Sequence, residues 1–389
     1  MIGIRTRVRA RDITENHRVS SPLELLFDLT FVVAISSLVT QLVHAVAEGH
    51  AAEVVGPFLM VFFAIWWAWN QFTWLASAYD NDDVPYRVLT MVQMGGVLVL
   101  AAGVPSAFAV QDFGAITLGY LIMRLGLLGT LIRTMVDDPE SRPNAQRYVV
   151  GIALVQVGWL LRLFFVPNEY IVPAFILLAV LELLVSPWAD RAGSLAWHPH
   201  HIAERYGLFA IILLGESVLA VTVAVQEAIV DGVDASLVVV AVSGLVLLFT
   251  LWWLYFSEPA AEGLVRNRDK SYIWGYGHYG VYASLAAIGA GLEIGVKAVT
   301  HHTEIGDVAA GYAVAIPLAV FLLLLWLLHA PLGPVSIPPV ATVVASVAIL
   351  AAPLTAAGIG ILGSTVLMTL ITVALLVAAF ASARSRLQA

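Results

Sequence analysis

The sequence predicts an all-α integral membrane protein with about twelve transmembrane helices arranged as two parallel six-helix repeats. The first observation is composition: 60% of the residues are hydrophobic and only 12% are charged, whereas soluble domains carry about 25% charged residues. The second is a series of long apolar runs separated by short polar stretches. The third is the return of similar sequence features about 180 positions later. Together these observations predict a polytopic membrane protein built from a duplicated unit.

Composition also excludes several classes of function. The 389 residues include no Cys, so disulfides, thiolate metal sites and thiol catalysis are absent. The net charge is −8, and no cluster of Lys and Arg predicts a nucleic-acid partner. The sequence has no HExxH, GxSxG, Walker-type or dinucleotide-binding motif. We therefore expect neither an enzyme nor a bound cofactor.

Residues 1–20 form a hydrophilic segment that carries five arginines. The segment lacks the short apolar region and cleavage site of a removable signal peptide. We expect the first apolar helix to act as the targeting signal, with this basic flank held in the cytoplasm.

The apolar runs are long enough to cross a bilayer, which takes about 20 residues per helix. Polar stretches at 80–87, 137–147, 189–201 and 258–270 separate several of them, and five prolines shorten the last ones. The predicted spans are residues 24–46, 54–77, 86–110, 113–134, 146–166, 170–188, 205–226, 236–257, 273–298, 308–329, 336–353 and 358–381.

The basic residues are distributed unevenly between the two sides of these spans. With twelve spans and a cytoplasmic N-terminus, nearly every Lys and Arg lies in a cytoplasmic loop or tail. Arg124, Arg162 and Lys297 are the three that do not. This positive-inside pattern predicts that both termini are cytoplasmic.

The two halves share features in the same order. Trp66-Trp67 in the second span corresponds to Trp252-Trp253 in the eighth, and Gly119-Tyr120 corresponds to Gly311-Tyr312. Because six spans return the chain to the same side, the halves are expected to be parallel repeats. The predicted organisation is a basic segment 1–20, repeat one 21–190, a linker 191–200, repeat two 201–383 and a tail 384–389.

The first span opens with two carboxylates, Glu24 and Asp28, which share one helix face. Carboxylates within a membrane helix are costly and usually functional. Two adjacent carboxylates repel each other, so one of them is expected to hold a proton readily. The alternative is that both cap the helix N-terminus and pair with cytoplasmic arginines. The start of the seventh span, which opens the second half, carries Glu204 at the corresponding position.

Two further charges lie near the middle of predicted spans. Glu216 is central in the seventh span and Arg124 is central in the fourth. In the structural interpretation, the two residues form an ion pair that neutralises both charges. In the functional interpretation, they form an ion or proton site at the membrane midplane.

Weaker candidates complete the set. Glu293 and Lys297 are spaced as an intrahelical ion pair. His278 is flanked by tyrosines, and Asn70 ends the Trp-rich stretch of the second span. The remaining weak candidates are Glu182 and Arg162.

A histidine cluster precedes the seventh span: His198, His200 and His201, with Glu204 nearby. Such a group resembles part of a transition-metal site. No second cluster supplies the missing ligands, so no metal is expected.

Three stretches carry a resemblance to a known family: PLELLFDLTFVVAIS in the first span, the Trp-rich second span, and HIAERYGLFAIILLGES in the seventh. They resemble the bacterial low temperature requirement protein A family over nearly the whole chain. The resemblance implies a multipass protein of the bacterial plasma membrane. The family name records a growth phenotype in the cold and gives no substrate.

The first span also resembles the first helix of the endolysosomal potassium channel family, through Glu24, Asp28, Phe31 and the residues Ala34, Ile35 and Ser36. That resemblance implies a pore lined by the first helix of each repeat, with a constriction near Val33 and Leu213. The family's Phe-Ser-Asp motif is Phe-Asp here, and Leu208 stands at the matching place in the second half. These departures argue against potassium selectivity.

The leading functional hypothesis is a channel-like permeation protein for a cation or proton. In it, Glu24 and Asp28 collect cations at the cytoplasmic mouth and Glu216 binds or relays them. The alternatives are a proton-coupled transporter of a small solute, and a membrane sensor or scaffold that transports nothing. The expected partners are the lipid bilayer and an inorganic cation or proton, and a homodimer is compatible with the sequence.

Overall fold

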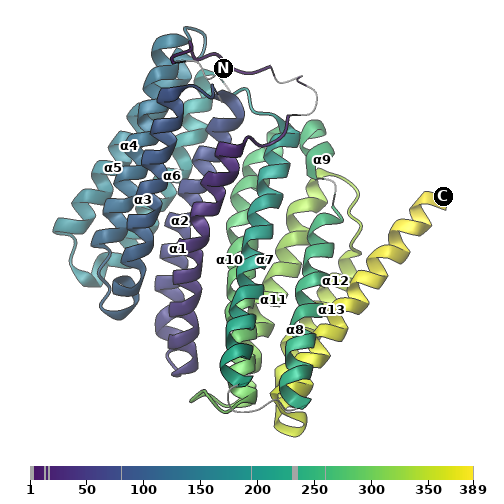
Figure 1. The fold of residues 1–389 in the computed structure, drawn as a ribbon. Helices are drawn as coiled ribbons and strands as arrows, with labels where there is room; N and C mark the ends of the chain where they lie inside the picture. The colour runs from purple at the N-terminus through teal and green to yellow at the C-terminus, as the bar shows by residue number, and fades with distance from the viewer. Residues whose placement is uncertain are drawn as a thin grey trace. The chain divides into compact units, whose positions relative to one another are not determined.

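The computed structural model describes residues 4–12, 15, 18–79, 81–193, 195–229, 235–258 and 260–388. In this part of the chain all regular structure is helical (Figure 1). The helices are α1 Pro22–Ala47, α2 Ala51–Tyr79, α3 Val84–Ala109, α4 Gly114–Asp137, α5 Arg142–Phe165, α6 Ile171–Ala189, α7 Pro199–Ile229, α8 Ala235–Phe256, α9 Ala260–Arg266, α10 Ser271–Val299, α11 Asp307–His329, α12 Pro339–Ala351 and α13 Ala356–Gln388.

The all-helical membrane class predicted from the sequence is confirmed. Eleven segments among the described residues are long and apolar enough to cross a bilayer. The last of them, Pro339–Arg384, contains both α12 and α13. With 13 residues, α12 is about 20 Å long, less than the hydrocarbon thickness of about 30 Å. The count of twelve crossings therefore stays a prediction.

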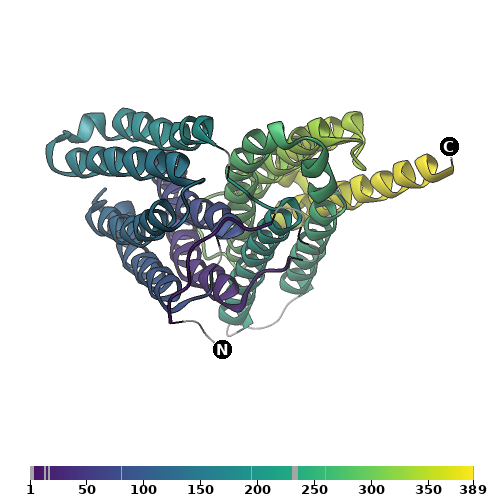
Figure 2. The ribbon, with the colours of Figure 1, turned by 90° about the horizontal axis from the view of Figure 1, so that it is seen from above.

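The chain forms two compact units, each described here by itself. Unit 1 consists of residues 1–38 and 56–205, and unit 2 of residues 39–55 and 206–389. Within unit 1, α3 packs on α4, α4 on α5 and α5 on α6. Figure 1 shows these helices side by side, and Figure 2 shows them from above.

The tightest helix pair of unit 1 is α3 with α4, which approach closely at glycines. A Cβ atom added to Gly96 would lie 2.6 Å from the carbonyl oxygen of Gly119. No larger residue fits at this crossing without moving one helix. Small residues of this kind let membrane helices pack backbone against backbone.

Unit 2 is built around α10, which packs against α8, α11 and α13. Its inner aromatic side chains surround His278, whose ring centre is 4.3 Å from that of Trp274 and 5.0 Å from that of Tyr206. The structure adds α9, a short helix inside the predicted loop 258–270. It also bends α13 at Gly360, whose φ is 68°.

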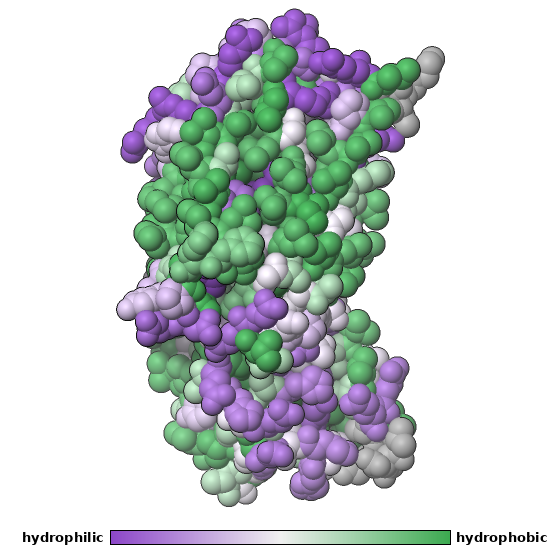
Figure 3. Space-filling model, turned by 90° about the vertical axis from the view of Figure 1, so that its left-hand side faces the viewer, coloured by the Kyte–Doolittle hydropathy of each residue, from purple (hydrophilic) through white to green (hydrophobic). Residues whose placement is uncertain are grey.

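The exterior of the helices is apolar. Large hydrophobic side chains such as Leu125, Leu154 and Phe164 are exposed. On the face shown in Figure 3, hydrophobic side chains form a broad band between hydrophilic regions. Exposed apolar surface of this extent is expected where lipid, rather than water, surrounds the helices.

The N-terminal segment of unit 1 lies across the loops that join the helices. The backbone N–H of Thr6 donates to Asp83 Oδ2 at 2.9 Å, and Arg133 Nη2 donates to the same oxygen at 2.6 Å. Asp83 Oδ1 also caps α3 by accepting from the N–H of Tyr86. Burial raises the pKa of Asp83, but Arg133 and these N–H donors outweigh it, so the net pKa is lowered.

Candidate functional site

The first helix starts with a capping box that fixes Glu24. The backbone N–H of Glu24 donates to Ser21 Oγ at 3.3 Å, and the N–H of Ser21 donates to Glu24 Oε2 at 2.7 Å. Pro22 occupies the first helical position, where its missing N–H is not needed. The Ser-Pro-Leu-Glu sequence thus both begins α1 and places a carboxylate inside the unit. Glu24 therefore caps the helix N-terminus.

Arg205 of α7 joins the two carboxylates of α1. Its Nε and Nη2 donate to Asp28 at 3.0 and 2.5 Å, and its Nη1 lies 3.1 Å from Glu24 Oε1. Trp69 Nε1 donates to Asp28 Oδ1 at 2.7 Å. Arg205 and Glu24 have no exposed surface, and Asp28 is 2% exposed. A planar guanidinium suits this two-carboxylate geometry because its donors are fixed in a fork.

Two further side chains complete this group. His201, one helical turn before Arg205, places Nε2 3.1 Å from Glu24 Oε1 and 3.4 Å from Oε2. Arg18 Nη2 lies 3.9 Å from Glu24 Oε1 and donates to the carbonyl of Ala76 at 2.8 Å. We call Arg18, Glu24, Asp28, His201 and Arg205 the entry network. Two carboxylates face two guanidinium groups, so the charges balance when His201 is neutral.

His201 has an unused nitrogen. Because a carboxylate can only accept, Nε2 carries the hydrogen that faces Glu24. Nδ1 is buried and has no hydrogen-bond partner among the described residues. The ring therefore has one nitrogen engaged with a carboxylate and one open to a proton.

The paired state of the carboxylates changes the predicted role of the entry. We expected Glu24 and Asp28 to attract cations, but both face Arg205 in the structure. Glu204 is held too, since its Oε1 accepts from the N–H of Ser20 at 3.3 Å. A cation approaching this group would meet the guanidinium as well as the acids.

A second buried group surrounds Glu182 of α6. Its Oε1 accepts from the hydroxyl of Tyr120 and from Trp159 Nε1, each at 3.1 Å. Its Oε2 accepts from Trp67 Nε1 at 2.9 Å and from Arg124 Nη2 at 3.0 Å. Four donors from α2, α4 and α5 thus converge on one carboxylate that has no exposed surface.

This second group corrects the expected pairing of Arg124. The sequence suggested Glu216 as its partner, but the structure gives Arg124 an ion pair with Glu182. Arg124 also bonds to the side chains of Gln71 and Tyr120. The Trp-rich stretch of α2 could have indicated a buried carboxylate nearby, because a buried indole N–H needs an acceptor. The sequence made Glu182 only a weak candidate because its neighbours in sequence are all apolar.

The remaining predicted residues lie in different surroundings. Val33 is half exposed, whereas Leu213 and Asn70 are buried, as is Glu216. The constriction near Val33 and Leu213 stays a prediction.

In unit 2, Glu293 and Lys297 form the expected i,i+4 ion pair at 3.4 Å. Lys297 also lies 3.7 Å from Glu227. His278 is fully buried among aromatic rings, with Nδ1 2.7 Å from the carbonyl of Trp274. This histidine is therefore a packed core residue rather than a surface group.

Of the three clustered histidines, His198 precedes α7, whereas His200 and His201 lie in its first turn. His198 Nδ1 accepts from the N–H of His201 at 3.4 Å, and burial lowers the pKa of His198. Among the described residues, no group of three or more His, Asp or Glu side chains is arranged to hold a metal ion.

The apolar exterior and the buried ion pairs define a multipass helical membrane protein. The sequence profile of the family described as bacterial low temperature requirement A protein (LtrA) matches residues 19–380. The chain belongs to this family. It is also 28% identical, over 69% of its length and 67% of the relative's, to an uncharacterized protein of Rhizobium meliloti (strain 1021). No solved structure matches the chain.

Proposed function

We propose that this LtrA-family protein transports protons across the bacterial plasma membrane, either alone in a channel-like manner or coupled to a small solute. The single observation that carries the proposal is the entry network, in which buried His201 presents one open nitrogen and one nitrogen engaged with Glu24. Ionisable residues at membrane depth are expensive and commonly serve ion or proton pathways.

The geometry favours protons over metal cations as the transported species. Both carboxylates of the entry network contact Arg205, and Arg18 supplies the second balancing charge. A metal cation would have to displace the guanidinium of Arg205 and lose its own hydration shell. A proton needs only one lone pair, and His201 Nδ1 offers one.

Histidine suits this task because its ordinary pKa is near neutral and its two nitrogens can act on opposite sides. Nδ1 would accept a proton while Nε2 passes its own to Glu24, 3.1 Å away. Protonated Glu24 would no longer attract Arg205, which stays bonded to Asp28. The charged groups facing this proton are Arg18, Glu24 and Arg205, so it belongs to the coupled group rather than to one residue.

We extend the proposal to the organisation of the chain. Twelve crossings in two parallel repeats, with both termini cytoplasmic, fit the positive-inside pattern. The packing of α3 on α4 in unit 1 and of α10 on α11 in unit 2 supports the repeat, because these pairs occupy corresponding positions. In this topology the entry network lies at the cytoplasmic side.

Proton flux into liposomes tests the proposal. Purified protein is reconstituted with a pH-sensitive dye inside, and a valinomycin-driven potassium potential is applied, with and without a panel of solutes. Glu24→Gln and His201→Gln should each lower the flux about tenfold or more, as loss of a proton relay does. Glu53→Gln is the matched control, because that carboxylate is exposed.

The outcomes separate the alternatives. Flux without solute indicates channel-like conduction, and flux only with a solute indicates coupling. Folded protein that moves no protons under either condition would overturn the proposal in favour of a sensor or scaffold. Equal flux in wild type and both network variants would overturn the role of the entry network.

A further inference from the structure

One buried arginine of unit 1 has no counter-ion among the residues that the structure describes. Arg162, near the end of α5, is 6% exposed. Among the described residues its side chain makes no hydrogen bond or ion pair, and its Nε and Nη2 atoms are buried without a partner. Every other arginine in the buried groups of unit 1 faces a carboxylate. Arg162 is therefore a donor group without an acceptor.

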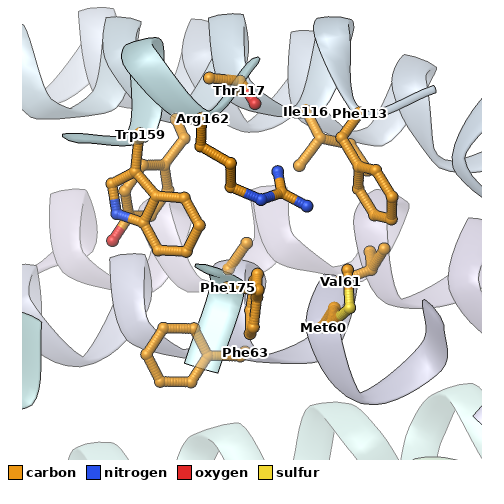
Figure 4. A pocket seen from close by; sticks show the side chains of 11 residues that line it. Met60, Val61, Phe63, Phe113, Ile116, Thr117, Trp159, Arg162 and Phe175 are labelled. Atoms are coloured by element: carbon orange, nitrogen blue, oxygen red, sulfur yellow. The ribbon is translucent and has the colours of Figure 1, made fainter. Parts of the chain in front are cut away.

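The guanidinium of Arg162 points into a pocket rather than toward the loops. Figure 4 shows it between Phe113, Trp159 and Phe175, with Met60 and Phe63 below. Its central carbon lies 5.1 Å from the ring centre of Phe113 and 5.8 Å from those of Trp159 and Phe175. The rings attract the cation through their faces, but they supply no hydrogen-bond acceptor for its N–H groups.

The pocket has about 30 Å³ of space that a water-sized group can enter, inside a wider hollow of about 420 Å³ that includes the open exterior. Apart from Arg162, its lining is almost entirely aromatic and aliphatic. The buried carboxylate of Glu182 already accepts from four donors, including Trp159 and Arg124. The pocket thus combines one unneutralised positive charge with an apolar wall.

The position of Arg162 in the unit is unusual for a basic residue. The other basic residues of unit 1 lie at the opposite helix ends or, for Arg124, in the middle of α4. The loops near Arg162 carry Asp112 and Glu169, yet neither pairs with it among the described contacts. A positive charge that only balanced local acids would face these loops, whereas Arg162 turns inward.

We propose that this pocket binds an amphiphilic anion, with the anionic head on Arg162 and the apolar chain against Phe63, Phe113 and Phe175. The head group of such a ligand would complete the guanidinium's hydrogen bonds, and its chain would lie along the open apolar side of the pocket. The head group is a carboxylate or a phosphate. Its source is either a free fatty acid or an anionic membrane lipid. The proposal is independent of proton transport by the entry network.

Native mass spectrometry of the full-length protein tests this binding. The probes are oleate, oleyl alcohol, butyrate and phosphatidylglycerol. Oleate should bind more tightly than oleyl alcohol, which has the same chain without the charge. Arg162→Met should weaken oleate binding about 30-fold or more, the scale for losing one partner of a buried charge pair. Arg147→Met, near the opposite end of α5, should leave binding unchanged.

Each outcome decides a part of the proposal. Arg162-dependent binding of phosphatidylglycerol but not oleate supports the site and identifies a lipid head group as the source. If butyrate binds as tightly as oleate, the apolar wall does not contribute to binding and that part of the proposal is overturned. Equal binding of oleate and oleyl alcohol, or unchanged oleate binding by a folded Arg162→Met protein, overturns the anion site. Proton flux measured in the same variant separates this result from the fate of the entry network.

Discussion

Replacing Arg205 by Met tests whether the entry network is held together by its central guanidinium. The substitution removes two hydrogen bonds to Asp28, at 3.0 and 2.5 Å, and the 3.1 Å ion pair with Glu24. Two carboxylates are then left buried with a single nearby cation, Arg18, whose guanidinium is 3.9 Å from Glu24. Breaking a buried charge pair from one side costs about 3–5 kcal/mol, or a factor of about 10²–10⁴ in the folding equilibrium.

The same reasoning predicts strong coupling with the partner residue. In Arg205→Met with Asp28→Asn, one uncompensated charge is gone, so the double variant should be more stable than the sum of the single losses predicts. The coupling energy should exceed about 1.5 kcal/mol, within the range for residues of one network.

The assay is reversible unfolding in mixed micelles of dodecyl maltoside and dodecyl sulfate, followed by circular dichroism and tryptophan fluorescence. Trp69 reports directly, because its indole donates to Asp28 at 2.7 Å. Additive losses within about 0.5 kcal/mol would refute the network. So would an Arg205→Met protein as stable as wild type.

Three further outcomes follow from the packing and electrostatics of unit 1. Gly96→Ala should destabilise the protein by about 1–3 kcal/mol through overpacking against α4, whereas Gly95→Ala, whose Cβ meets nothing within 4 Å, should not; chemical unfolding of the two variants compares them. Glu182→Gln should lower the free energy of unfolding by about 3–5 kcal/mol. The new NH₂ group would face other hydrogen-bond donors, and Arg124 would lose its counter-ion. A melting temperature equal to wild type would contradict this. The pKa of Asp83 is lowered in the folded protein. Its contribution to the free energy of unfolding is therefore complete above the ordinary pKa of about 3.9 and is lost as the pH falls through the folded pKa. Asp83→Asn should flatten the fall of unfolding free energy at acid pH, and an unchanged slope would count against the pair with Arg133.

The membrane class and the helices followed from the sequence because apolar runs of spanning length have few alternatives. Capping of the helix N-terminus by Glu24 was among the alternatives because the capping residues are local in sequence: Ser21, Pro22 and Glu24 lie within four positions. Glu24 itself was a candidate because it shares one face of a membrane helix with Asp28.

The partners of the buried charges could not be predicted in the same way. Glu182 and Arg124 are 58 positions apart, and Arg205 and Asp28 are 177 apart. Which helix faces meet is decided by packing, such as the close approach at Gly96, and periodicity within one helix carries no information on it. Helix α7 also begins earlier than the predicted span, at Pro199. That extension places His201 and Arg205 on a regular helix, one turn apart.

Infrared difference spectroscopy tests most directly whether the entry network takes up a proton. Spectra of the reconstituted protein at neutral and mildly acidic pH are compared for wild type, Glu24→Gln, Asp28→Asn and the exposed control Glu53→Gln. We expect a carboxylic acid band that forms on acidification, is retained in the control and is lost or shifted in both network variants. Identical carboxyl spectra in wild type and both network variants would contradict it.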